Sequence, residues 1–128
     1  MNNSIYTDNF PSLIQRRLDK YAYSFIGKGW VKIIFDLDKK LSILHPRYEI
    51  AQIKQKFAQL KFYVNFIDDD SYKYIFDAEK IASTTCESCG SLGELRIIKD
   101  YHLVLCNEHF ATLSNDKSQY DEHFQLIS

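Results

Sequence analysis

The sequence has little of what a disulfide-rich or membrane-spanning protein needs. It contains three cysteines in 128 residues, an odd number that would leave one thiol unpaired in a disulfide framework. Its longest apolar run, residues 31–37, is interrupted by Lys32 and Asp36 and could not span a bilayer. The N-terminus lacks the basic and apolar regions of an export signal. We therefore expect a cytoplasmic protein with reduced cysteines.

Sequence motifs of catalysis are also missing. The chain contains no nucleophile elbow, phosphate-binding loop or metalloprotease helix, and no internal repeat or low-complexity linker. What it does contain is typical of a folded protein, because 45% of its residues are hydrophobic and 15% are aromatic. The length is that of a single domain with a modest core.

All three cysteines and one of the four histidines gather in one short stretch. Two residues separate Cys86 from Cys89, and Cys106 from His109, and sixteen residues lie between the pairs. A tetrahedral zinc site needs two such pairs, each held by a tight turn, with room for a β-hairpin between them. This spacing predicts one structural Zn²⁺ bound by Cys86, Cys89, Cys106 and His109.

The same residues have other interpretations. A redox Cys-x-x-Cys motif normally opens a helix that follows a strand, and no such pattern precedes Cys86. His102 lies in the same stretch, but its spacing from Cys106 places it along a strand, so we expect a surface or cross-strand residue. His45 is a weak candidate for a metal ligand or a catalytic base.

Helical periodicity marks the N-terminal part of the chain. The first helix is expected over residues 9–27, followed by a second from Trp30 to Leu44. Pro46 should end the second helix, because a proline pushes the preceding residue out of helical geometry. We expect Trp30 to belong to the core, in one apolar stripe with Ile34, Leu37, Leu41 and Leu44.

Residues 48–66 fit both a helix and a pair of strands. We favour a hairpin of residues 48–55 and 60–66, since the second segment alternates and is rich in Phe, Tyr and Val. The cluster Asp68, Asp69 and Asp70 could suggest a cation site, but it suits the N-terminus of a helix that runs to Ala82. A second hairpin is expected from residues 94–98 and 102–106.

These elements predict an α+β fold, with N-terminal helices packed on a small antiparallel hairpin and a C-terminal zinc-ribbon hairpin. We treat residues 1–128 as one domain. Within it, residues 1–83 form a helical and β-stranded body, residues 84–110 form the zinc ribbon, and residues 111–128 form a C-terminal tail with a short docking segment near Phe124.

The net charge of −1 hides an uneven distribution. Residues 1–64 carry eleven Lys and Arg against five Asp and Glu, whereas residues 65–128 carry five against twelve. Such asymmetry can steer a partner of matching sign, or the two halves can simply neutralise each other in the fold. The candidate partner-binding residues are Arg16, Arg17, Lys20, Lys54, Lys56 and Lys61 on the basic side and Asp68, Asp69 and Asp70 on the acidic side.

Several short motifs follow one another in a specific order. They are Gly29-Trp30, Ile53–Phe57 with Leu60–Tyr63, Ala78-Glu79, Thr85–Gly90 and Leu105–His109. In this order the chain resembles a family of small uncharacterised proteins of bacteria and their phages, over about residues 28–110. The family usually has Glu at position 55 and Gly at position 58, so Ala58 weakens the expectation of a tight turn there. The resemblance supplies no enzyme activity that could be carried over to this chain.

Three classes of function remain. Catalysis is disfavoured, because four protein ligands leave the metal no open position for water or substrate. A nucleic-acid-binding ribbon should be basic, whereas residues 92–128 hold three basic residues against six acidic ones, so nucleic acid would have to contact the N-terminal half. We favour a non-enzymatic protein that binds another protein, such as an inhibitor, an immunity protein or a phage anti-defence factor.

Overall fold

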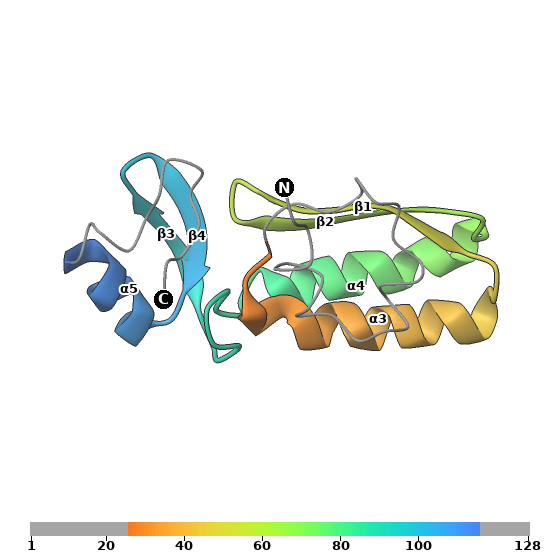
Figure 1. Cartoon of the computed structure of the whole chain (residues 1–128), viewed down its shortest axis with the longest axis horizontal. Coiled ribbons are helices and arrows are strands. Elements are labelled where there is room, and N and C mark those ends of the chain that lie inside the picture. Colours follow the sequence, from red (N-terminus) through yellow and green to blue (C-terminus); the bar gives the residue numbers. More distant parts are fainter. Residues whose placement is uncertain (1–25, 116–128) are drawn as a thin grey trace, which may run out of the picture.

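Helices and two antiparallel hairpins make up the part of the protein that the computed structural model describes, residues 26–115 (Figure 1). This confirms the predicted α+β class. The first helix expected over residues 9–27 lies almost entirely outside the described residues, as does the docking segment near Phe124. In chain order the elements are η1 (Lys28–Trp30), α3 (Val31–Leu44), β1 (Glu49–Lys56), β2 (Gln59–Asn65), η2 (Asp69–Ser71), α4 (Tyr72–Ala82), β3 (Glu94–Ile98), β4 (Tyr101–Leu105) and α5 (Asn107–Asn115).

Helix α3 forms where the apolar stripe predicted it, and the core placement of Trp30 is confirmed. Trp30, Ile34 and Leu41 are fully buried. Leu44, predicted to lie in the same stripe, is 48% exposed at the last residue of the helix. His45 then leaves helical geometry before Pro46, as expected.

The ambiguous segment forms the hairpin that we favoured. Strands β1 and β2 pair antiparallel, with a β-bulge between Ile50 and Gln52. Ile53 and Phe62 lie opposite each other on the inner face and are both buried. Ile50 and Leu60 are buried from the same two strands. A two-stranded sheet needs such an apolar face packed on another element, and here the helices provide it.

A two-residue turn joins β1 to β2 without any glycine. Phe57 and Ala58 both have positive φ, 51° and 68°. A turn with two left-handed residues matches the twist of a hairpin, although glycine or asparagine usually occupies it. The tight turn therefore forms despite Ala58. The turn of the second hairpin, Lys99-Asp100, has the same geometry.

We predict that Ala58→Gly stabilises the protein by about 0.5 kcal/mol. Relief of the left-handed alanine should gain roughly 1–2 kcal/mol, and loss of its buried methyl should cost about 0.8 kcal/mol. The midpoint of urea unfolding measures the difference. Ala111→Gly is the control, because Ala111 is exposed in the middle of α5 and has no positive φ, and it should lose about 0.5–1 kcal/mol. Equal losses in both variants would show that the turn is unstrained.

The acidic cluster lies at the start of α4, as predicted. Asp68 caps the preceding η2 turn by accepting a hydrogen bond from the Ser71 backbone N–H at 3.0 Å. The hydrogen bond from the Ser71 side chain is the main cause that lowers the pKa of Asp68. His45 lies within 3.2 Å of the same carboxylate. Asp68 therefore has a structural role at the helix start.

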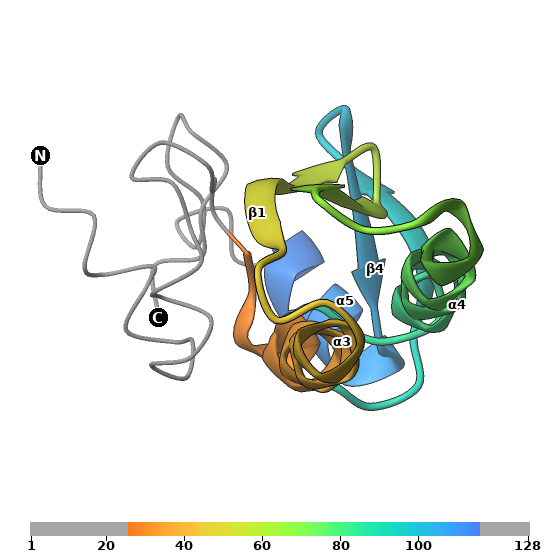
Figure 2. The same ribbon diagram turned by 90° about the vertical axis from the view of Figure 1, so that its right-hand side faces the viewer.

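Helices α3 and α4 lie side by side beneath the β1–β2 hairpin, so the body has two layers (Figures 1 and 2). Ile75, Ala78 and Ala82 are the buried residues of α4. Glu79 accepts a hydrogen bond from the Phe62 backbone N–H at 3.3 Å, which ties α4 to β2. Tyr48, immediately before β1, donates a hydrogen bond to the buried Asp38 carboxylate of α3. No helix of the described residues is long and apolar enough to cross a membrane.

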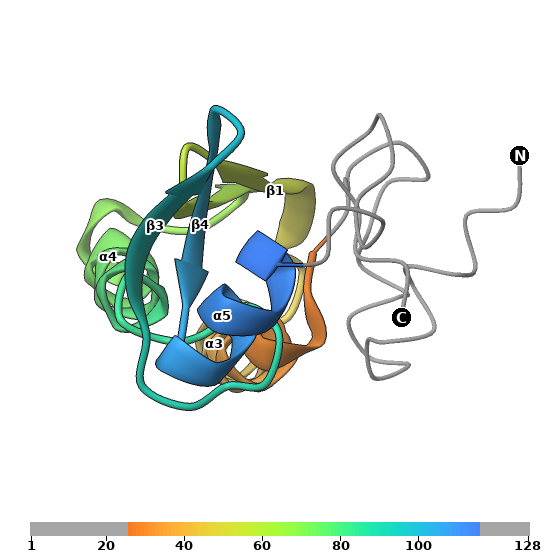
Figure 3. The ribbon, with the colours of Figure 1, turned by 90° about the vertical axis from the view of Figure 1, so that its left-hand side faces the viewer.

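Strands β3 and β4 form a second hairpin at one end of the body, with α5 packed against it (Figures 1 and 3). Strand β4 covers residues 101–105, one residue earlier than predicted. Helix α5 was not predicted, and it runs through the boundary we placed between ribbon and tail at residue 110. Its Leu113 is buried, and Phe110 packs against the same cluster. A small second core contains Cys86, Ile98, Leu103, Leu105 and Leu113.

Candidate metal centre

The four predicted ligands come together at one point. The sulfur atoms of Cys86, Cys89 and Cys106 and a ring nitrogen of His109 all lie within 4.8 Å of one another. The Sγ atoms of Cys89 and Cys106 are 3.9 Å apart, and Nδ1 of His109 lies 3.8 Å from Cys86 Sγ and 3.2 Å from Cys106 Sγ. The structure therefore confirms a Cys₃His group that could hold a metal ion.

The first pair of ligands sits on a tight turn after α4. The Gly90 N–H donates to the Cys86 carbonyl at 2.9 Å, and the Cys86 N–H donates to the Ser91 carbonyl at 2.7 Å. Gly90 has a φ of 84°, a left-handed conformation that favours glycine. This turn directs both sulfur atoms to the same side, which is why the Cys-x-x-Cys-Gly pattern suits a metal site.

The second pair of ligands lies at the start of α5. Cys106 immediately precedes the helix, and the backbone N–H of His109 points to its sulfur at 3.4 Å. This contact with the His109 N–H is the main cause that lowers the pKa of Cys106 to about 6. Hydrogen bonds from Ser91 lower the pKa of Cys89, whereas burial raises the pKa of Cys86. The pKa shifts of Cys89 and Cys106 are thus in the direction of the thiolate, the form that binds metal.

The other histidines of the described residues lie elsewhere. His102 lies on β4 opposite Ile97, and its ring contacts the Phe57 ring edge-on at 5.6 Å between centroids. His102 is thus a cross-strand residue, as expected. His45 contacts Asp68 and Ser71 near the far end of α3 and does not belong to the Cys₃His group.

The turn that precedes α3 packs directly on the backbone of the first ligand pair. The Gly29 N–H donates to the Glu87 carbonyl at 2.8 Å. A Cβ atom on Gly29 would lie 2.0 Å from the Cys86 carbonyl oxygen and 2.6 Å from the Gly90 nitrogen. Only glycine allows this approach. The Gly29-Trp30 motif was visible in the sequence, but nothing there indicated that it contacts the metal centre.

Trp30 makes the second contact from this turn. Its indole N–H donates to the Thr85 carbonyl at 2.9 Å, next to the first cysteine, while its ring is fully buried.

We predict that Trp30→Ala lowers the free energy of unfolding by about 3–5 kcal/mol, as for other buried large-to-small changes. Thermal unfolding of the metal-loaded protein measures the loss. An unchanged melting temperature would mean that Trp30 is not part of the core.

A buried carboxylate links the body to the second hairpin. Glu87 is 5% exposed and accepts hydrogen bonds from the Val104 backbone N–H at 2.7 Å and from the Gln55 side chain at 3.1 Å. Gln55 also donates to the His102 carbonyl at 2.7 Å. Burial raises the pKa of Glu87 to about 7. Sequence reasoning missed this contact, because it joins three segments that are distant along the chain.

The candidate partner-binding residues lie at separate places. Lys54 and Lys61 are directly opposite each other in the β1–β2 hairpin, and Lys56 follows two residues after Lys54. Asp69 and Asp70 are exposed beside the cap residue Asp68. Arg16, Arg17 and Lys20 lie outside the described residues.

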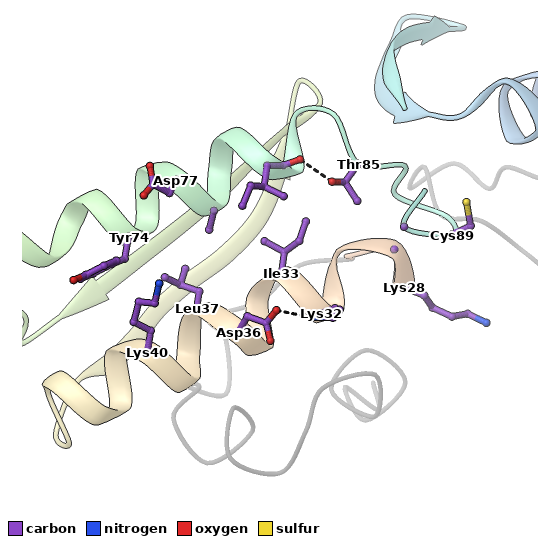
Figure 4. A pocket seen from close by; sticks show the side chains of 14 residues that line it. Lys28, Lys32, Ile33, Asp36, Leu37, Lys40, Tyr74, Asp77, Thr85 and Cys89 are labelled. Carbon is purple, nitrogen blue, oxygen red and sulfur yellow. Dashed lines mark hydrogen bonds and ion pairs between the residues drawn. The ribbon is translucent and has the colours of Figure 1, made fainter. Parts of the chain in front are cut away.

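A groove that the sequence did not indicate runs between α3 and α4 (Figure 4). Its volume is about 550 Å³, and its apolar part is formed by Ile33, Leu37, Ala78 and Ile81. Charged side chains of both signs surround this part, with Lys28, Lys32, Asp36 and Lys40 from the α3 side and Asp77 from α4. Cys89 and Gly90 lie at one end, so the groove reaches the Cys₃His group.

Comparisons of the chain with protein-family models, with curated proteins and with solved structures found no match. The resemblance to small bacterial and phage proteins therefore stays a prediction.

Proposed function

We propose that Cys86, Cys89, Cys106 and His109 bind one zinc ion that stabilises the fold. In a tetrahedral site with bonds of about 2.0–2.3 Å, neighbouring ligand atoms lie roughly 3.5–3.8 Å apart. Three of the six distances between ligand atoms, 3.2, 3.8 and 3.9 Å, fall close to that range, and all six are within 4.8 Å. Three thiolates and one imidazole are a donor set that suits zinc.

Four protein ligands give this zinc a structural role. A catalytic zinc usually has three protein ligands and keeps a fourth position for water or substrate. Replacement of zinc by Co²⁺ tests this, because the visible spectrum of cobalt responds to its ligands. We expect a tetrahedral spectrum that does not change when a hydroxamate or cyanide is added below the concentration that extracts the metal. A new spectrum with the metal still bound would show an open position and favour an enzyme.

We further propose that the protein is a non-enzymatic module that binds another protein. The observation that carries this proposal is the groove between α3 and α4. An apolar centre surrounded by charges of both signs is the usual anatomy of a protein interface. An amphipathic helix of the partner fits such a groove, with apolar side chains against Ile33 and Ile81. An inhibitor, an immunity protein or an anti-defence factor would act in this way, and the resemblance to bacterial and phage proteins permits each of them.

Substitution in the groove tests the protein-binding proposal. Ile81 lines the groove and is 55% exposed, so Ile81→Glu should leave the fold intact. The partner is first identified by affinity capture from the native host and then purified. The Ile81→Glu variant should bind this partner at least about tenfold more weakly than the wild type, as is typical for loss of an anchor residue. Ile43→Glu is the matched control, because Ile43 is 77% exposed on α3 and lies outside the groove. Equal binding by both variants would contradict the proposal.

A further inference from the structure

The outer face of the β1–β2 hairpin carries a cluster of lysines. Successive residues of a strand point to opposite faces, so the face away from the helices is fixed by the register. Its residues are Lys54 opposite Lys61, Lys56 opposite Gln59, and Gln52 opposite Tyr63, with the Glu49–Asn65 pair at the far end. We call the first six residues the basic hairpin face.

The charge on this face is largely uncompensated. Within residues 26–115, none of the three lysines forms an ion pair. Burial raises the pKa of the nearby Glu79 carboxyl, and the charge of Lys61 acts in the opposite direction. Like charges directly opposite each other on a hairpin are destabilising. The Lys54–Lys61 pair therefore costs stability in the free protein, and a bound anionic group would remove that cost.

The composition of the face distinguishes two kinds of anionic partner. Protein interfaces have an apolar centre and are depleted in lysine. The basic hairpin face has no Leu, Ile, Val, Phe or Met, and its only ring is that of Tyr63, which is 47% exposed. Lysines around an exposed aromatic ring are the usual means of binding single strands, with phosphates on the lysines and a base stacked on the ring. The glutamines add donors and acceptors for base edges.

We propose that the basic hairpin face binds single-stranded nucleic acid. Lys54, Lys56 and Lys61 contact phosphates, and Tyr63 stacks on a base. This surface belongs to the sheet side of the body, whereas the groove proposed for a protein partner lies between the two helices. The two proposals therefore stand on different residues and can fail separately.

Fluorescence anisotropy of the metal-loaded full chain tests this proposal. The probes are a labelled single strand of about 20 nucleotides, long enough for a typical single-strand site, the matching duplex and poly-glutamate. We expect the single strand to bind most tightly. Lys54→Glu with Lys61→Glu should weaken that binding at least tenfold and reduce the slope of log K against log salt by about 1.4, because each lost phosphate contact removes about 0.7. Tyr63→Leu should weaken binding at low salt without changing the slope.

The control variant has the same change in net charge, but on the helices and not on the basic hairpin face. Lys39→Glu with Lys73→Glu alters two exposed lysines of α3 and α4, and it should keep nearly all of the affinity. Zinc content and circular dichroism of each variant verify the fold. The proposal is wrong if the wild-type protein binds no single strand at low salt, or if both double variants lose affinity equally. Tighter binding of the duplex, or of poly-glutamate, would assign the face to a different partner and would also overturn it.

Discussion

Removal of the metal is expected to unfold the part of the chain that follows Thr85. The second core contains only five buried residues, Cys86 among them, which is too little apolar surface to hold two strands and a helix. Binding of a structural zinc contributes roughly 10 kcal/mol or more to the stability of small zinc-dependent folds. Loss of the zinc should therefore outweigh the stabilisation that the small apolar core provides. Amide hydrogen exchange with and without chelator measures this. Protection should disappear from β3, β4 and α5, while α3 keeps most of its protection because it packs in the larger core.

Single substitutions separate metal binding from packing. Cys89 is exposed, so Cys89→Ser removes a ligand with little change in packing, and it should reproduce the effect of the chelator. His102→Ala should keep the metal, because the His102 ring lies against Phe57 and not in the Cys₃His group. Loss of metal from the His102 variant, or full protection of β3–β4 after chelation, would contradict the account.

Second to removal of the metal, Gly29→Ala is expected to cause the largest loss of stability, although it adds only one methyl group. The new Cβ would lie 2.0 Å from the Cys86 carbonyl oxygen, and that oxygen belongs to a hydrogen-bonded turn that cannot move freely. Overpacking of this kind costs roughly 1–3 kcal/mol and occasionally more. We expect a loss of at least about 3 kcal/mol, because relief requires the turn to leave the body. Zinc affinity should fall with it, as the turn carries two ligands.

The neighbouring Lys28→Ala is the control for this experiment. Lys28 is exposed, so the change adds no contact with the metal centre and should alter stability by less than about 0.5 kcal/mol. Thermal unfolding and a competitive zinc titration measure both variants. If Gly29→Ala matched Lys28→Ala in both measurements, the close packing between the α3 turn and the metal centre would not exist in solution.

The features that the sequence predicted correctly depend on local spacing. The ligand pairs Cys86 with Cys89 and Cys106 with His109 each close within one turn, so their chemistry is visible in a few residues. Helix α3 follows from its apolar period, and the start of α4 follows from the capping chemistry of Asp68. The prediction of the β1–β2 hairpin is also local: only the alternation of apolar and polar residues in its second strand favours a hairpin over a helix.

The features that were missed depend on packing between distant segments. Helix α5 has a polar sequence and Leu113 is its only buried residue over residues 107–114, so the sequence predicts a C-terminal tail from residue 111. In the sequence, Glu87 resembles an ordinary surface carboxylate between two cysteines. In the fold, its carboxylate accepts hydrogen bonds from the Val104 backbone and the Gln55 side chain. The contact of Gly29 with Cys86 joins segments 57 residues apart, and no local pattern encodes it. The groove between α3 and α4 likewise exists only after both helices have packed.

Zinc binding by the Cys₃His group can be measured directly. Elemental analysis of protein purified without chelator, combined with X-ray absorption at the zinc edge, measures both the stoichiometry and the ligands. We expect one zinc per chain, bound by three sulfur atoms at about 2.3 Å and one nitrogen at about 2.0 Å, with no bound water. A folded protein without stoichiometric metal would contradict the account, and so would a zinc with fewer than four protein ligands.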